Sequence, residues 1–335
     1  MLSAAPTVVV DGSPATGRYT GSPAHIDWSG LRGSFQRSAV WKHFHHKRWH
    51  YVAMATEECF VGLAIVDLGW TNTAFAYVFD RQQKKLLVDF SQDGFPGLTA
   101  QVSDRPTLGA LSWFRHIGTS MRFEHLQGSR YSLQLRIGKG SGKDFEIEAE
   151  LDAAQTAPFL CAIGPIGQGG CAHSTVKSSA LSVSGQVTVG AKTFDLGGGV
   201  ASFDYSNGLL ARDTQWCWAS AHSPSVGFNL QHGYFGNHEN ALWLDGELIP
   251  LGNAHFDFDP KSPSSPWDIH TDDGLLVLRF EPEGARQQSK NLLVAASYYI
   301  QPIGTFSGTV KASTHALARQ VHGLVGVTED HQSRW

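Results

Sequence analysis

The chain has 335 residues, of which 41% are hydrophobic and 17% are charged, and its formal net charge is −4. This is the composition of a globular protein with a substantial core, which excludes a disordered or fibrous chain. Lysine and arginine are scattered and form no long basic run, so neither a nucleic-acid partner nor an anionic membrane surface is expected.

No stretch approaches the roughly 18–20 apolar residues that span a bilayer, so stable membrane insertion is not expected. The first residues, MLSAAPTVVVDGSP, lack the basic and apolar regions of a secretion signal. The four cysteines are widely spaced and form no CxxC pair, which favours reduced thiols. These features predict a cytoplasmic protein.

Residues 1–40 are rich in glycine, proline and serine and are predicted to form an irregular leader. From residue 41 onward, strand-length apolar runs follow one another with only a few residues between them, as in VGLAIVDLGW, TNTAFAYVFD and KKLLVDF. Short connections favour antiparallel strands, because parallel strands need long crossovers.

A second series of such runs begins near residue 177 and includes ALSVSGQVTVG, QWCWASAH and ALWLDGELIPL. Open twisted sheets rarely exceed about ten strands, so two β-barrels or curved sheets fit better than one sheet. The sequence therefore predicts an all-β, antiparallel protein with domains at 41–170 and 171–335. The glycine-rich segment 164–174 is the expected link.

Four histidines, His43, His45, His46 and His50, are the first candidate metal ligands, since an HxH pair can place two imidazoles on one strand face. Basic residues follow the pair where a carboxylate ligand would be needed, and cations oppose a divalent ion. No metal site is therefore predicted, and the alternative is a solvated strand entry.

Asp67 lies in the apolar run VGLAIVDLGW, so it has apolar neighbours whichever strand face is buried. A carboxyl group in such surroundings either is satisfied by hydrogen bonds or has a raised pKa. Asp67 is thus a candidate substrate-binding acid, or a structural carboxylate that closes the turn at Gly69.

Asp204 lies between two aromatic residues in FDY, after three glycines that allow a bent strand or a close backbone approach. Arg212, Trp216 and Trp218 follow in RDTQWCWAS, and alternation puts both indoles on one strand face. Paired indoles suit a planar or polyene ligand and can stabilise a carbocation. The alternative is a core layer in which Arg212 pairs with a neighbouring aspartate.

Residues 227–251, GFNLQHGYFGNHENALWLDGELIPL, concentrate polar groups between two strand-like runs. Glu239 can serve as an acid or base with His238 or His232 as proton partner, and an asparagine can bind a substrate oxygen. The alternative is a hydrogen-bonded turn that fixes the hairpin register. The polar candidates here are Asn229, His232, His238, Glu239 and Asn240.

The same stretch, together with RDTQWCWASAH at 212–222 and GVTEDHQSRW at 326–335, resembles a bacterial and fungal family of two-domain lipocalin-like proteins of unknown function. That family is similar in fold to carotenoid 1,2-hydratase (hydroxyneurosporene synthase), to AttH-like proteins and to fungal Diels-Alderases. The resemblance implies two lipocalin-like β domains with a pocket in or between them. It carries no catalytic residue over to this chain.

The motifs GxSxG, GxxxxGK[ST] and a strand–helix GxGxxG are absent from the sequence, so no nucleotide or other cofactor is predicted. The leading hypothesis is a hydratase, isomerase or cyclase that acts on an apolar isoprenoid or polyene-like molecule by acid–base chemistry. Asp204, Glu239 and His238 are the catalytic candidates. The competing hypothesis is a non-catalytic carrier of a lipid or other hydrophobic small molecule.

Overall fold

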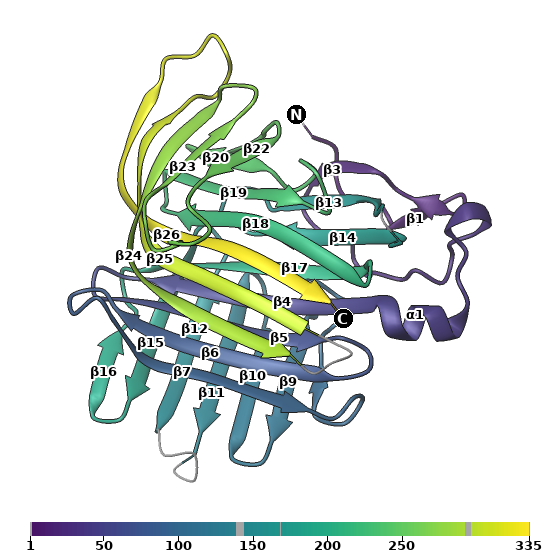
Figure 1. Cartoon of the computed structure of the whole chain (residues 1–335), viewed down its shortest axis with the longest axis horizontal. Coiled ribbons are helices and arrows are strands. Elements are labelled where there is room, and N and C mark those ends of the chain that lie inside the picture. Colours follow the sequence, from purple (N-terminus) through teal and green to yellow (C-terminus); the bar gives the residue numbers. More distant parts are fainter. Residues whose placement is uncertain (1, 139–143, 168, 292–295, 335) are drawn as a thin grey trace.

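The computed structural model describes residues 2–138, 144–167, 169–291 and 296–334. Two curved antiparallel sheets form most of the molecule, with 60% of residues in strands and 3% in helices (Figure 1). The first sheet is a nearly closed, barrel-like sheet and the second is a half-barrel. The predicted all-β class and the pair of curved antiparallel sheets are confirmed.

The first sheet has 15 strands, which come from the first two thirds of the chain. They are β3 (Gly17–Thr20), β4 (His46–Ala55), β5 (Cys59–Asp67), β6 (Asn72–Asp80), β7 (Lys85–Gly94), β8 (Ala100–Gln101), β9 (Leu111–His116), β10 (Thr119–His125), β11 (Arg130–Ile137), β12 (Phe145–Asp152), β13 (Leu160–Pro165), β14 (Ala172–Lys177), β15 (Leu181–Val189), β16 (Lys192–Asp195) and β17 (Val200–Leu209). The main path runs β7-β6-β5-β4-β17-β15-β12-β11-β10-β9-β8, and β14 pairs with β17 beside it.

The second sheet has nine strands. They are β18 (Asp213–His222), β19 (Val226–Gly233), β20 (Ala241–Leu244), β21 (Glu247–Pro250), β22 (Ala254–Asp257), β23 (Trp267–Thr271), β24 (Leu276–Asn291), β25 (Ala296–Val310) and β26 (Arg319–Arg334). Their spatial order is β21-β20-β19-β18-β26-β25-β24-β23-β22, so the last strand of the chain lies beside the first strand of this sheet.

The leader is more regular than the sequence predicted. It contains the small hairpin β1 (Val9–Val10) and β2 (Ser13–Pro14), the 3-10 turn η1 (Gly33–Phe35), and strand β3, which pairs with β13. It leads into α1 (Ala39–His45), where the Ser38 hydroxyl caps the helix by accepting a bond from Trp41 N at 3.2 Å.

The chain changes sheets between Leu209 and Asp213. Segment 164–174, predicted as a link, instead contributes to the paired strands β13 and β14 within the first sheet. Strands β14 to β17 thus follow the predicted domain boundary at residue 170 but remain in the first sheet. The division of the chain into folding units stays a prediction.

Burial explains why the two sheets stay together. Strand β11 alternates between buried and exposed residues, as expected for a sheet with one face toward water. Strand β5 is instead buried on both faces: Val61, Leu63 and Ile65 join the barrel core, whereas Phe60 and Ala64 pack in a second cluster with residues of the other sheet. The outer face of the barrel at β4, β5 and β6 therefore requires a cover.

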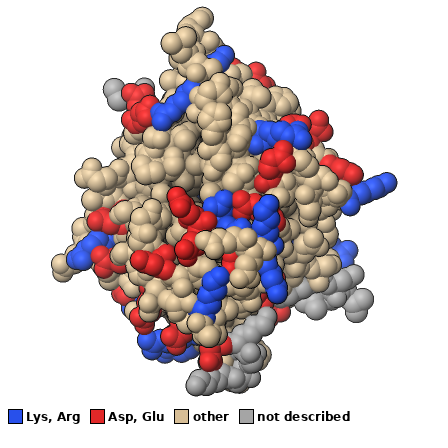
Figure 2. All heavy atoms as spheres, turned by 90° about the vertical axis from the view of Figure 1, so that its left-hand side faces the viewer, with Lys and Arg blue, Asp and Glu red and all other residues tan. Residues whose placement is uncertain are grey.

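Figure 2 shows one face of the surface on which lysine and arginine lie beside aspartate and glutamate rather than gathering in one patch. Such a mixed face offers a nucleic-acid backbone no continuous basic track. In the described part of the chain, the helices are too short and too polar to cross a bilayer.

His50 provides a test of how this core responds to pH. It is buried beside Phe123, with ring centroids 4.1 Å apart, and burial lowers its pKa to about 3. The unfolded chain takes up a proton on this imidazole near pH 6.5 whereas the folded chain does not, so stability falls as the pH decreases through that value. At pH 5 the loss is about 2 kcal/mol.

We expect His50→Phe to remove this part of the acid sensitivity. Urea unfolding of the parent and the variant at pH 7 and pH 5 measures the contribution of His50 to this loss of stability. Other buried histidines, such as His222, are present in both proteins, so their contributions cancel in the comparison. The same loss of stability between the two pH values in both proteins would contradict the assignment.

Candidate functional site

A cavity of about 110 Å³ lies where the two sheets meet. Strands β4, β5 and β6 form one side, and β18, β19, β25 and β26 form the other. An engineered cavity of roughly 150 Å³ holds a benzene molecule, so this one suits a slightly smaller group. Its aromatic lining consists of Trp49, Tyr51, Phe75, Trp216, Trp218, Tyr234 and Tyr299.

The aromatic rings reach the cavity because alternate residues of a strand share a face. Trp49 and Tyr51 are two apart on β4, and Trp216 and Trp218 are two apart on β18. Trp49 stacks with Trp216 at 6.3 Å between ring centroids, and Tyr51 meets Trp218 edge-on at 5.9 Å. The two sheets are thus joined through rings that also line the cavity.

A buried cluster of three charged groups lies at the same cavity. Lys177 and Asp204 are cross-strand neighbours on β14 and β17, with 2.6 Å between Nζ and Oδ1. The same Nζ lies 3.0 Å from Oε2 of Glu239, which comes from the connection between β19 and β20. Lys177 and Glu239 are each 3% exposed. One cation is therefore shared by two carboxyl groups away from water.

This sharing shifts the pKa of both Glu239 and Lys177. Burial raises the pKa of Glu239, Lys177 opposes the rise, and Asp204 adds to it, so the pKa of Glu239 stays above its ordinary value. Burial also disfavours the charge on Lys177, but the two carboxylates outweigh this effect and raise its pKa. Both shifts favour the protonated forms of Glu239 and Lys177, which is the direction expected where two carboxyl groups share one cation away from water.

A second carboxyl group, Glu329 on β26, lines the same cavity. Trp216 Nε1 donates to its Oε1 at 2.8 Å, and Gln301 Nε2 donates to its Oε2 at 3.0 Å. His331, two residues later on the same strand face, places Nδ1 3.5 Å from Oε1. Tyr77 donates in turn to the Gln301 side-chain oxygen. Glu329 is held as a hydrogen-bond acceptor with a titratable neighbour.

The asparagines of the 227–251 stretch support the cavity from behind. Asn229 accepts a bond from Trp218 Nε1 and donates to the Glu239 carbonyl, both at 2.9 Å. Asn240 accepts from the Gln231 amide at 2.6 Å and donates to the Gly252 carbonyl at 2.9 Å. They fix the turn that carries Glu239, and neither side chain is part of the cavity lining.

Three other predicted residues lie outside the cavity lining. His238 directly precedes the lining residue Glu239, but its own ring packs against Phe235, with ring centroids 4.8 Å apart. His232 is exposed and contacts the Ala254 carbonyl at 3.2 Å, and Arg212 is exposed. His232 is the strand neighbour of the lining residue Gln231, so alternation turns it away from the cavity. His238 lies in the connection between β19 and β20 and Arg212 precedes β18, so strand alternation does not set their directions.

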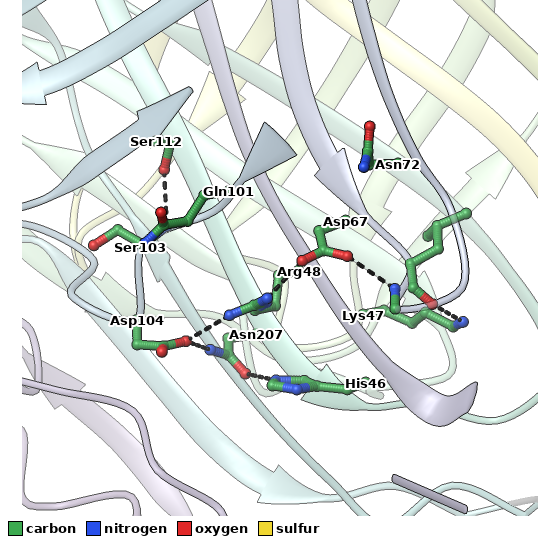
Figure 3. A network of polar contacts seen from close by, with 12 residues as sticks. His46, Lys47, Arg48, Asp67, Asn72, Gln101, Ser103, Asp104, Ser112 and Asn207 are labelled. Atoms are coloured by element: carbon green, nitrogen blue, oxygen red, sulfur yellow. Dashed lines mark hydrogen bonds and ion pairs between the residues drawn. The ribbon is translucent and has the colours of Figure 1, made fainter. Parts of the chain in front are cut away.

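Asp67 also lies outside the cavity lining, in a polar network at the end of β5 (Figure 3). Its carboxylate accepts bonds from Arg48 at 2.5 Å and from the Gly69 amide at 2.9 Å, and Arg48 continues to Asp104 at 2.9 Å. Gly69 has a φ of +81°, a conformation that glycine adopts at little cost. Asp67 has the structural arrangement of a carboxylate that closes this turn.

The histidines near the start of β4 have separate environments. His45 Nδ1 contacts the Leu210 carbonyl at 2.6 Å. His46 Nε2 contacts Asn207 Oδ1 at 2.8 Å (Figure 3). His50 is in the barrel core, 3.3 Å from Ser112 Oγ. Each imidazole therefore serves local packing or hydrogen bonding.

A family model described as a domain of unknown function (DUF2804) matches residues 8–335. The chain belongs to the DUF2804 family. The match covers both sheets and every residue of the cavity, so the site described above lies within the family's common region. The family relationship inferred from the sequence is confirmed.

Two solved structures share the fold of this DUF2804 protein over nearly their whole lengths. One is an AttH-like protein from Nitrosomonas europaea, with a TM-score of 0.55, 11% identity, and coverage of 98% of this chain and 99% of that chain. The other is kievitone hydratase from Nectria haematococca, with a TM-score of 0.50, 10% identity, and coverage of 100% and 98%. No curated protein matches the sequence. At such low identity the likeness shows a common fold.

Sequence reasoning missed several lining residues of this DUF2804 protein. Lys177 is the last residue of β14 and has no acidic neighbour in sequence, and its partners lie on β17 and in the connection between β19 and β20. Glu329 and His331 carried a usable signal, because residues two apart on a strand share a face. Gln301 carried none, since a single glutamine in a buried strand has many structural uses.

Replacing the shared cation tests the buried cluster. Lys177→Met leaves Asp204 beside Glu239 without a counter-charge, so we expect the free energy of unfolding to fall by about 3–5 kcal/mol at pH 7. Adding Asp204→Asn should recover part of the loss. Urea denaturation of both variants measures these effects.

The control is Arg136→Met, which removes an exposed ion pair with Glu148 and should cost less than about 1 kcal/mol. If Lys177→Met is no more destabilising than this control, the cluster has no role in holding the sheets together.

Proposed function

We propose that this DUF2804 protein is a cofactor-independent enzyme that protonates a carbon–carbon double bond of an apolar, isoprenoid or polyene-like small molecule. Hydration, isomerisation or cyclisation follows. The observation that carries the proposal is a buried carboxyl group with a raised pKa, Glu239, at a cavity walled by aromatic rings. Pairs of acids in unlike environments are a recurring basis of acid–base catalysis.

Glu239 is the proton donor in this proposal. Its raised pKa keeps a proton available where an ordinary glutamic acid has lost it. Transfer of that proton to one alkene carbon uses the π electrons for the new C–H bond and leaves a cation on the other carbon. Asp204 and Lys177 hold the Glu239 side chain in place. After the proton transfer Glu239 is a carboxylate, and the Lys177 ammonium group forms an ion pair with it.

The aromatic wall stabilises the cation. Indole rings attract positive charge through their π faces, by about 2 kcal/mol or more where water is excluded. Trp49, Trp216 and Trp218 line the cavity together with Tyr51 and Tyr234. Their packing against one another fixes the wall before the substrate arrives, so little reorganisation is needed during the reaction.

Glu329 and His331 are the proton acceptors. In a hydration, water adds to the cationic carbon and passes its proton to this pair. In an isomerisation, the pair removes a proton from a carbon next to the cation. In a cyclisation, a second double bond of the substrate attacks the cation first, and the pair then removes a proton. The bonds from Trp216 and Gln301 hold Glu329 as an acceptor in all three cases.

The shared fold supports a hydratase over the other two reactions, because one solved neighbour is named as a hydratase. Fold likeness alone does not transfer chemistry. The second acid–base group, Glu329 with His331, serves hydration, isomerisation and cyclisation alike, so the products must distinguish the three reactions.

The alternative is a carrier of a hydrophobic small molecule. The position of Lys177 favours the carrier hypothesis, because a purely structural cluster also needs one ammonium group to compensate two carboxyl groups. Incubation of the protein with isoprenoid alkenes in H₂¹⁸O and in D₂O separates the possibilities by mass spectrometry. A hydratase incorporates ¹⁸O, an isomerase or cyclase incorporates only deuterium, and a carrier returns its ligand unchanged.

Amide variants test the assigned roles. Glu239→Gln removes the proton donor and Glu329→Gln removes the acceptor, so we expect each to lower kcat by about 10²–10⁴-fold. Retained ligand binding, measured by native mass spectrometry, would show that the cavity is intact. Glu148→Gln is the matched control, because that carboxylate is exposed on the barrel surface. Full turnover in both cavity variants would reject the catalytic roles.

The pH profile tests the direction of proton transfer. The pKa of Glu239 is raised, so the proton is present at low pH and is lost as the pH rises through that raised value. We therefore expect kcat/KM to fall on the alkaline side, and Glu239→Asp to move this limb. An activity that increases steadily from pH 6 to pH 9 would contradict a protonated donor.

A further inference from the structure

A second hollow, here called the outer groove, adjoins the cavity. It has a volume of about 720 Å³ and is lined by the start of β18, the start of β25 and the end of β26, near the C-terminus in Figure 1. Tyr234 lines both spaces. The cavity and the outer groove are thus neighbouring compartments.

The floor of the outer groove contains a row of hydroxyl groups. Thr214 on β18, Ser333 on β26 and Ser297 on β25 are cross-strand partners, and all three line the groove. Ser333 Oγ lies 3.5 Å from Ser297 Oγ. Three adjacent strands therefore present small hydroxyl side chains at one level of the sheet.

The next level of the same sheet face lines the cavity. Two residues further into the sheet, Trp216, His331 and Tyr299 form the corresponding cross-strand row. Alternation keeps the two rows on one face, so the face runs without a break from the hydroxyl row to the aromatic row.

Hydrogen bonds join the two levels. His331 Nε2 lies 2.5 Å from Ser333 Oγ and 3.3 Å from Ser297 Oγ. The imidazole that belongs to the cavity wall is therefore in direct contact with the groove floor. A ligand on the hydroxyl row would contact serines that hydrogen-bond to the group that the proposed reaction uses as a proton acceptor.

The two volumes limit what can bind. The cavity, at about 110 Å³, takes a group somewhat smaller than benzene, whereas the groove falls in the range of roughly 300–1,000 Å³ that holds whole ligands. A molecule larger than one small apolar unit does not fit in the cavity alone, and the outer groove is the neighbouring space that could hold the rest of it.

The groove is suited to a neutral polar group. Among its described lining residues, the charged ones are Asp213 and Arg334, whose formal charges cancel, and the two are cross-strand partners. The Thr214 hydroxyl donates to the Ala211 carbonyl at 3.0 Å and so meets a ligand as an acceptor, whereas the two serine hydroxyls can donate or accept, as a hydroxylated ligand requires. An anionic group in the groove would meet a carboxylate as well as a guanidinium, both on exposed side chains.

We propose that the substrate has two parts: a small apolar end with the reacting double bond, held in the cavity, and a neutral, hydroxyl-bearing part, held on Thr214, Ser297 and Ser333 in the outer groove. This inference rests on the proposed function for its reactive end. The hydroxyl row is a specificity determinant, and the aromatic cavity recognises only the terminal unit.

Three probes that share one apolar end test the proposal: 3-methyl-2-buten-1-ol, its β-glucoside and its monophosphate, each titrated calorimetrically against the full chain. We expect the glucoside to bind tightest. The double variant Ser297→Ala/Ser333→Ala should weaken glucoside binding about three- to tenfold and leave the affinity of the free alcohol unchanged. Ser184→Ala, at an exposed serine of the barrel, is the matched control.

Equal affinity for the alcohol and the glucoside, a preference that survives the double variant, or tightest binding of the phosphate would each overturn the two-part substrate. Binding of none of the probes would do the same. These outcomes concern affinity alone, whereas the proposed function is decided by isotope incorporation and by the turnover of Glu239→Gln. A failure of the two-part substrate proposal is therefore distinguishable from a failure of the proposed function.

Discussion

The constraint on which the rest depends is the burial of β4, β5 and β6 on both faces. A barrel wall is ordinarily wet on its outside, but here Phe60 and Ala64 turn outward from the barrel and are buried. Leaving such apolar area in water is unfavourable by about 25 cal/mol per Å². The half-barrel covers this wall, and the space left between two curved surfaces of aromatic side chains becomes the cavity.

The buried charges lie at this junction for the same reason. Lys177 and Asp204 belong to the first sheet and Glu239 to the second, so the cluster forms only when the sheets are in contact. Taking three ionisable groups out of water is costly, and mutual pairing offsets the cost only in part. The raised pKa of Glu239 follows from the same burial and from the nearby Asp204, both of which disfavour a further negative charge.

The sequence predicted most features of the fold and some of the residues of the site. Strand-length runs with short connections predicted antiparallel β structure, and the spacing of Trp216 and Trp218 predicted a shared face, on which both do line the cavity. Alternation could not decide between the neighbours His238 and Glu239, since the turn between β19 and β20 has no strand period. The structure puts Glu239 into the cavity and His238 against Phe235.

What the sequence determined by itself was therefore the element type, the antiparallel pairing and the family, because these follow from short-range periodicity and local motifs. What only the tertiary structure decided was which distant side chains meet. Lys177 of the first sheet meets Glu239 from the connection between β19 and β20, and Tyr77 of the first sheet meets Gln301 of the second, although the partners are far apart in the chain. Such contacts depend on how two curved sheets are set against each other, and no local pattern of residues records that.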